Sequence, residues 1–118
     1  MAALDGESLY RKFTETKQEP LRLAAALEGF FREPPPEEAR RLAYGAYLKR
    51  RVRPAAAALI GAEDVEKLAR LEALGWLDGR LVDELIRNAR ERRKPASLVW
   101  LLRLKREKYG FQDRDFSL

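Results

Sequence analysis

Side chains that can carry out catalysis are few in this sequence. It contains no histidine and no cysteine, so it has no imidazole that titrates near neutral pH and no thiolate nucleophile. Serine occurs three times, and no neighbouring base stands beside any of the three to activate the hydroxyl: Ser8, Ser97 and Ser117. A glycine-rich phosphate-binding loop is also absent. The sequence therefore predicts a protein that is not an enzyme.

Metal and cofactor sites are not predicted either. Zinc sites built from cysteine and histidine are excluded by the composition. The acidic residues that could bind magnesium lie mostly on predicted helices, where they alternate with arginine and lysine. We therefore expect no metal and no cofactor.

The composition indicates an all-α protein. The 118 residues suit one domain, and 46% are apolar and 36% charged. Strong helix formers dominate, whereas valine, isoleucine and threonine are sparse. No apolar run approaches the roughly 20 residues that a membrane span requires, and no secretory signal is evident at the start. We expect a cytoplasmic protein that is not bound to membranes.

Seven helical segments are expected from the turn signals and the apolar periodicity. The run Pro34-Pro35-Pro36 and Pro95 interrupt helices, because proline lacks a backbone donor. Gly61 and Gly75 stand where helices should end, and Asp5 or Ser8 is available to cap the first helix. Helical spacing assigns six apolar stripes to the core: Leu9, Tyr10 and Phe13; Leu23, Ala24, Leu27, Phe30 and Phe31; Ala39, Leu42, Ala43, Ala46 and Tyr47; Val65, Leu68, Ala69 and Leu71; Leu81, Val82, Leu85, Ile86 and Ala89; Leu98, Val99, Leu101, Leu102 and Leu104.

Part of the pattern repeats along the chain. The apolar residues Val65, Leu68 and Ala69 correspond, 33 positions later, to Leu98, Leu101 and Leu102, and Trp76 corresponds to Tyr109. Pro20 and Pro54 lie 34 positions apart, and each begins an alanine-rich segment. A period of this length is typical of proteins that stack helical hairpins.

The segment Glu19-Pro20-Leu21-Arg22-Leu23-Ala24 resembles the ankyrin signature Thr-Pro-Leu-His-x-Ala. The chain thus resembles a divergent ankyrin-like repeat protein of the bacterial type. The resemblance implies a short stacked array of helical pairs over residues 20–51, 53–76 and 79–109. An N-terminal capping helix over residues 1–18 would complete one domain of residues 1–111, followed by a flexible tail, 112–118. The alternative is an irregular helical bundle.

Charge allows three interpretations. The net charge of +5 comes from basic clusters: Lys49-Arg50-Arg51-x-Arg53, residues 87–94 and Arg103-x-Lys105-Arg106-x-Lys108. These clusters are either solvated helix ends, a surface that binds an acidic protein partner, or a surface that binds nucleic acid through phosphate contacts. Exposed aromatics among the basic residues, which nucleic-acid binders usually carry, are not evident.

The favoured function is a protein–protein interaction module: an adaptor, accessory or inhibitor subunit. Its predicted contact surface is the exposed face of the helix over residues 79–93 together with the preceding turn, and a docking motif in the tail is a further candidate. The predicted partner-binding residues are Trp76, Asp78, Arg80, Arg87, Arg90, Phe116 and Leu118. The partner, the pathway and the oligomeric state are left open.

Overall fold

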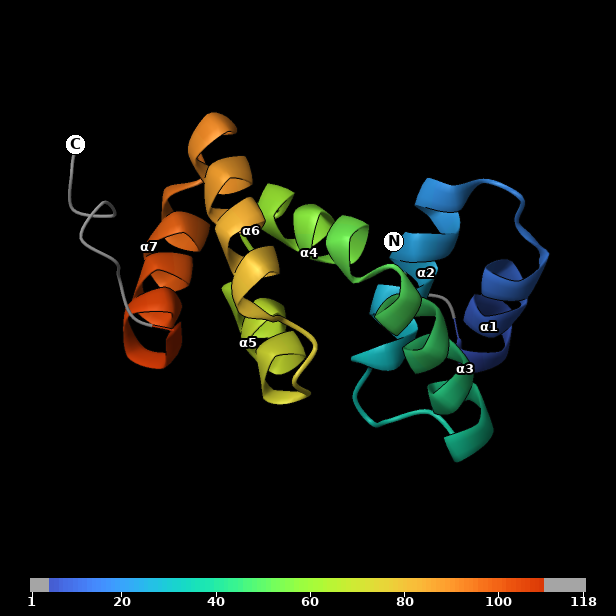
Figure 1. Cartoon of the computed structure of the whole chain (residues 1–118). Helices are drawn as coiled ribbons and strands as arrows, with labels where there is room; N and C mark the ends of the chain where they lie inside the picture. Colours follow the sequence, from blue (N-terminus) through green and yellow to red (C-terminus); the bar gives the residue numbers. More distant parts are fainter. Residues whose placement is uncertain (1–4, 110–118) are drawn as a thin grey trace. The chain divides into compact units, whose positions relative to one another are not determined.

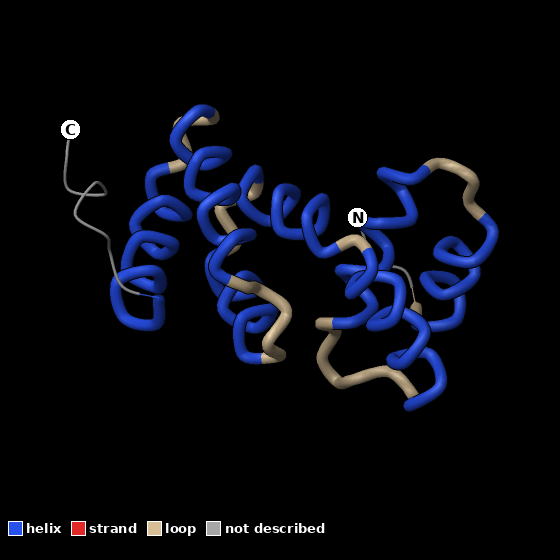
Figure 2. The backbone as a smooth tube through the Cα atoms, in the orientation of Figure 1, coloured by secondary structure: helices blue, strands red, loops and turns tan. Residues whose placement is uncertain are grey.

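The computed structural model describes residues 5–109. Within that range it contains seven α-helices, a final π-helical turn and no strand (Figures 1 and 2). The elements are α1 (Gly6–Glu15), α2 (Glu19–Phe30), α3 (Glu38–Arg50), α4 (Val52–Gly61), α5 (Val65–Ala73), α6 (Gly79–Glu91), α7 (Pro95–Leu104) and η1 (Lys105–Tyr109). The predicted all-α class with about seven helices is confirmed. None of the helices in the described range has the length and apolar character that a bilayer span requires.

The helices belong to two compact units. The first unit ends at Ala55 and the second begins at Ala56, so the boundary falls within α4. In the first unit α2 packs against both α1 and α3, and in the second α7 packs against α5 and α6. The single domain expected over residues 1–111, the capping role of residues 1–18 and the tail stay predictions.

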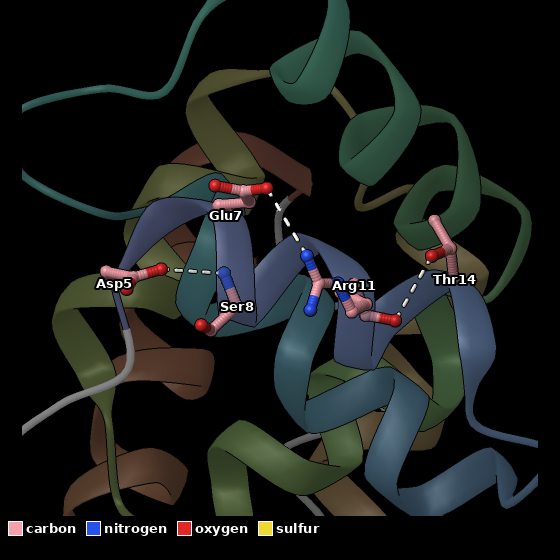
Figure 3. A network of polar contacts seen from close by, with 5 residues as sticks. All are labelled: Asp5, Glu7, Ser8, Arg11 and Thr14. Atoms are coloured by element: carbon pink, nitrogen blue, oxygen red, sulfur yellow. Dashed lines mark hydrogen bonds and ion pairs between the residues drawn. The ribbon is translucent and has the colours of Figure 1, made fainter.

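The first helix begins with a local cap (Figure 3). The Asp5 carboxylate accepts a 2.7 Å hydrogen bond from the Ser8 N–H, so Asp5 is the N-cap of α1. That hydrogen bond lowers the pKa of Asp5. One turn further on, Arg11 forms a 3.3 Å ion pair with Glu7, and the Thr14 hydroxyl donates to the Arg11 carbonyl. Of the two capping residues that the sequence allows, the structure uses Asp5.

The first unit is built around Tyr44, which is 1% exposed. The ring of Tyr44 lies on the backbone of Gly29, where any Cβ would overlap the ring atoms. Phe13 packs beside the same ring with a centroid distance of 4.9 Å. Glycine in α2 thus lets an aromatic ring of α3 approach the helix backbone closely.

The rotation of α3 differs from the prediction. The predicted buried stripe is wrong at Ala39, Leu42 and Ala46, which are exposed, whereas Ala43 and Tyr47 are half-buried. The fully buried residues of α3 are Tyr44 and Leu48. The side of α3 that carries Tyr44 faces Gly29 of α2, and Leu42 lies away from it. In α2 the buried alanines are likewise Ala25 and Ala26, and not Ala24.

A polar contact joins the start of α2 to the end of α3. The Tyr47 hydroxyl donates a 2.6 Å hydrogen bond to Glu19, and Arg51 forms an ion pair with the same carboxylate. The Arg51 guanidinium also lies over the Tyr47 ring, 4.6 Å from its centroid. Burial together with the hydrogen bond to Glu19 raises the pKa of Tyr47 to about 12.

The turn between α4 and α5 and the turn between α6 and α7 have the same geometry, with a non-glycine residue in the left-handed conformation. The turn between α5 and α6 shares this geometry, with Gly75 at that position. Glu63 (φ 55°) and Arg93 (φ 56°) both adopt the left-handed conformation, and each is the second residue after the end of its helix. Two backbone hydrogen bonds close a Schellman motif in each turn. The bonds are Glu63 N–H to Ile60 O (2.9 Å), Asp64 N–H to Leu59 O (2.9 Å), Arg93 N–H to Arg90 O (3.2 Å) and Lys94 N–H to Ala89 O (2.9 Å).

These turns set the register of the repeat in the second unit. The equivalent residues Glu63 and Arg93 are 30 positions apart, which is about one helical turn less than the 33 positions read from the apolar pattern. A shift of one turn leaves apolar residues on the same face, so the pattern by itself does not separate the two registers. The helix pairs α4–α5 and α6–α7, called here the two hairpins, are therefore joined by equal turns. The stacking of such pairs and the ankyrin resemblance stay predictions.

The core of the second unit largely follows the predicted stripes. All five predicted α6 residues are buried: Leu81, Val82, Leu85, Ile86 and Ala89. Leu68 and Leu71 of α5 and Leu101 of α7 are fully buried as well. Two predicted core positions are wrong, because Ala69 is exposed and Val99 is 56% exposed. The buried face of α7 uses Ser97 and Leu101, which lie one turn apart on the helix.

We expect Leu101→Ala to destabilise the protein by about 2–5 kcal/mol, because it leaves a cavity in a fully packed site. Val99→Ala, two residues away on the exposed side of α7, should change the free energy of unfolding by less than about 0.5 kcal/mol. Urea unfolding followed by circular dichroism measures both. Equal effects of the two substitutions would contradict the assigned core face of α7.

We expect Gly75→Ala to destabilise the protein by about 1 kcal/mol. Gly75 follows α5 with φ 76°, and no atom lies within 4 Å of the position that a Cβ would take, so the cost comes from the backbone conformation alone. Arg93→Gly, at the corresponding position after α6, should have the opposite sign because it relieves the same strain. Chemical denaturation of the two variants checks this pair of signs.

Candidate protein-interaction surface

The predicted contact helix, α6, is held firmly at its start and along one face. Asp78 is its N-cap and accepts a 2.7 Å hydrogen bond from the Leu81 N–H. The apolar face described above is buried along the whole helix. Asp78 is one of the predicted partner-binding residues, and its carboxylate has this structural role at the helix start.

The opposite face of α6 carries an exposed stripe of charged residues, called here the α6 stripe: Arg80, Asp83, Arg87 and Arg90. From Arg80 to Arg90 it runs roughly 15 Å along the helix. Asp83 forms a 2.8 Å ion pair with Lys105. The side chains of the three arginines make no hydrogen bond or ion pair with another residue in the range 5–109. The structure thus brings these arginines onto one face and pairs none of them with a carboxylate of that range.

The turn between α5 and α6 uses its two large apolar residues differently. Leu77 is 2% exposed, whereas Trp76 is half-buried. The Leu77 carbonyl accepts a 2.7 Å hydrogen bond from the Tyr109 hydroxyl, which ties η1 to this turn. Leu77 therefore fills the core, and Trp76 is partly accessible in the turn that precedes the α6 stripe. A partner-binding role of Trp76 stays a prediction.

Glu63, which the sequence pattern does not single out, caps a helix of the other hairpin with its carboxylate. It accepts hydrogen bonds from the Ala96 N–H (3.0 Å), the Ser97 N–H (3.2 Å) and the Ser97 hydroxyl (2.8 Å). The N-cap position of α7 is Lys94, which makes no side-chain cap bond. Glu63 therefore binds the otherwise unpaired N–H groups of the first turn of α7. The lack of a capping residue before Pro95 is the available sequence signal.

The neighbouring residue, Asp64, caps a second helix. It accepts a 3.1 Å hydrogen bond from the Lys67 N–H and a 3.0 Å bond from the Lys67 ammonium group, so it is the N-cap of α5. One turn thus provides carboxylates to the starts of two helices. For both Glu63 and Asp64 burial opposes ionisation, but the hydrogen bonds outweigh it and lower the pKa.

Further polar contacts link the two hairpins over a narrow range of separations. Arg92 donates a 2.8 Å hydrogen bond to the Ala57 carbonyl of α4, 35 positions earlier. Lys108 pairs with Glu72, 36 positions earlier. The Glu63 contacts span 33 and 34 positions, and the bond from Tyr109 to Leu77 spans 32. The two hairpins therefore contact each other at a nearly constant separation in the sequence.

The remaining candidate residues carry no comparable geometry. Phe116 and Leu118 lie outside the described residues. Ser97 is fully buried, and its hydroxyl is bonded to Glu63. In the part of the chain that the structure describes, no group of three acidic side chains is placed to hold a metal ion.

We expect the stability contributed by the Glu63 cap to depend on pH. The native pKa of Glu63 lies below its usual value of 4.5, so its ionised form stabilises the fold above that value, and this stabilisation is lost as the pH falls through the native pKa. Glu63→Gln should therefore destabilise the protein near pH 7, and its difference from the wild type should shrink near pH 3. Urea unfolding at a series of pH values measures this.

Glu66→Gln is the matched control, because Glu66 lies in the first turn of α5 and is exposed. Its effect should be smaller than that of Glu63→Gln at neutral pH. A Glu63→Gln penalty that stays constant from acid to neutral pH would contradict the assigned cap.

Comparison of the chain with protein-family models, with curated proteins and with solved structures found no match.

Proposed function

We propose that this protein is a non-enzymatic protein–protein interaction module that binds an acidic protein partner through the α6 stripe and the Trp76 turn. The observation that carries the proposal is the set of three arginines, Arg80, Arg87 and Arg90, on one exposed helix face. The adaptor, accessory and inhibitor roles named above all require a surface that binds another protein.

The charge of the α6 stripe supports an acidic partner. Its one acidic member, Asp83, is already paired with Lys105. The stripe therefore presents three guanidinium groups that can bind carboxylates in bidentate geometry. A partner that offers carboxylates at matching positions gains affinity, specificity and association rate from these charges.

The packing of α6 supports a preorganised surface. The helix is capped by Asp78 and buries five apolar residues on its inner face. Arginines on a helix fixed in this way lose less conformational freedom on binding than arginines on a loop. Trp76 adds a partly exposed aromatic side chain at one end of the stripe, and tryptophan and arginine are among the residues most enriched at binding hot spots.

We expect the triple variant Arg80→Ala, Arg87→Ala and Arg90→Ala to lower the affinity for the partner by about tenfold or more, which is roughly 1.4 kcal/mol. The partner is first isolated by photo-crosslinking from position 84 of the full chain in its native host and identified by mass spectrometry. Affinities are then measured by calorimetry with purified proteins.

The matched control removes the same number of charges elsewhere: Lys12→Ala, Lys49→Ala and Arg50→Ala, all exposed in the first unit. It should leave the affinity unchanged. Equal losses in both variants would mean that only net charge matters. Retardation of random duplex DNA, with a log–log salt slope of about −0.9 for each phosphate contacted, would favour nucleic-acid binding in place of this proposal.

A further inference from the structure

The exposed side of α7 has two shallow hollows in the second unit. One, of about 490 Å³, is lined by Val65, Pro95, Ala96, Val99, Trp100 and Arg103. The other, of about 380 Å³, is lined by Val99, Leu102, Arg103, Arg106 and Glu107. Val99 and Arg103 line both, so the hollows lie next to each other on either side of these two side chains. Together they are called here the α7 track. It runs from Pro95 to Arg106, which is roughly 16 Å or three helical turns.

Three of the residues that line the α7 track are apolar and accessible. Val99 is 56% exposed, and Leu102 and Trp100 are half-buried. Val99, Leu102 and Arg106 are spaced by three and four positions, so they follow one face of the helical segment. An apolar strip of this kind matches the recognition mode in which an amphipathic helix lies in a groove.

The basic cluster at the end of α7 consists of two lysines and two arginines, and only the lysines form ion pairs within the described residues. Lys105 pairs with Asp83, and Lys108 pairs with Glu72, so both lysines are neutralised by this chain. Arg103 and Arg106 line the track, and their side chains form no ion pair or hydrogen bond with a residue of the described range. An acidic occupant of the track would complement these two arginines.

We propose that the α7 track binds an acidic amphipathic helix of a partner protein, about three turns long, whose apolar side covers Val99 and Leu102 and whose carboxylates pair with Arg103 and Arg106. This inference rests on the proposed role as a protein-binding module and places a second contact surface on it. A second copy of this chain fits less well, because it would bring four arginines and only two glutamates into one symmetric interface.

The test uses the full-length protein and a helix-stapled peptide of about 14 residues with leucines at positions i, i+3 and i+7 and glutamates on both flanks. A second peptide carries lysine in place of every glutamate. ¹H–¹⁵N spectra recorded with up to about 1 mM peptide should show shifts at Val99, Leu102 and the Trp100 indole for the acidic peptide. The acidic peptide should bind at least about tenfold more tightly than the basic one.

A charge-reversed variant, Arg103→Glu with Arg106→Glu, should invert this preference. The control, Arg80→Glu with Arg87→Glu, makes the same change of charge on the α6 stripe and should leave it unaltered. The control changes the α6 stripe, which carries the proposed function, and the charge-reversed variant changes only the α7 track. Failure of the α7 track proposal is therefore distinguished from failure of the proposed function.

Four results would overturn the proposal. The first is the absence of shifts along α7 at the highest peptide concentration, and the second is equal binding of the acidic and basic peptides. The third is binding that appears only after Asp113→Asn and Asp115→Asn, because it would identify the protein's own residues 110–118 as the occupant. Concentration-dependent dimerisation that Arg103→Glu abolishes would instead identify a second copy as the occupant.

Discussion

The second unit depends on one carboxylate that serves a helix remote in the sequence. Glu63 stands just after the end of α4 and binds the N–H groups of Ala96 and Ser97 at the start of α7. A helix start that lacks a capping side chain leaves backbone donors unpaired, and this costs free energy when the surroundings are buried. The fully buried Ser97 lies at this place. The contact fixes where the second hairpin meets the first.

The left-handed backbone of Glu63 is part of the same arrangement. A non-glycine residue with positive φ is strained, yet a glycine at this position would have no carboxylate to cap α7. The corresponding residue of the next hairpin, Arg93, adopts the same conformation, and Arg92 beside it donates to the Ala57 carbonyl. Each turn thus carries a side chain that contacts the other hairpin.

The basic residues differ in whether they pair with a carboxylate of this chain, which their spacing in the sequence does not indicate. Lys105 and Lys108 bind carboxylates of this chain, whereas the arginines of the α6 stripe and the α7 track pair with none in the described range. Arginine forms bidentate contacts with carboxylates and is the less strongly hydrated of the two cations. The proposed surfaces are therefore arginine surfaces, and the two lysines form ion pairs within the chain.

The helical class and most helix ends follow from the amino-acid sequence alone, because proline, glycine and acidic caps act over a few residues. The buried face of α6 follows from it too, since the apolar residues of this helix recur at the helical period without ambiguity. For α3 and α7 the same reasoning assigns Leu42 and Val99 to the core, and both are exposed.

These two faces depend on tertiary packing: on the fit of Tyr44 against Gly29 in the first unit, and on which sides of α7 its neighbours cover in the second. The Glu63 cap likewise needs the fold, since its partners lie 33 and 34 positions away. Local preferences act over a few residues, and none of them connects residues at that separation.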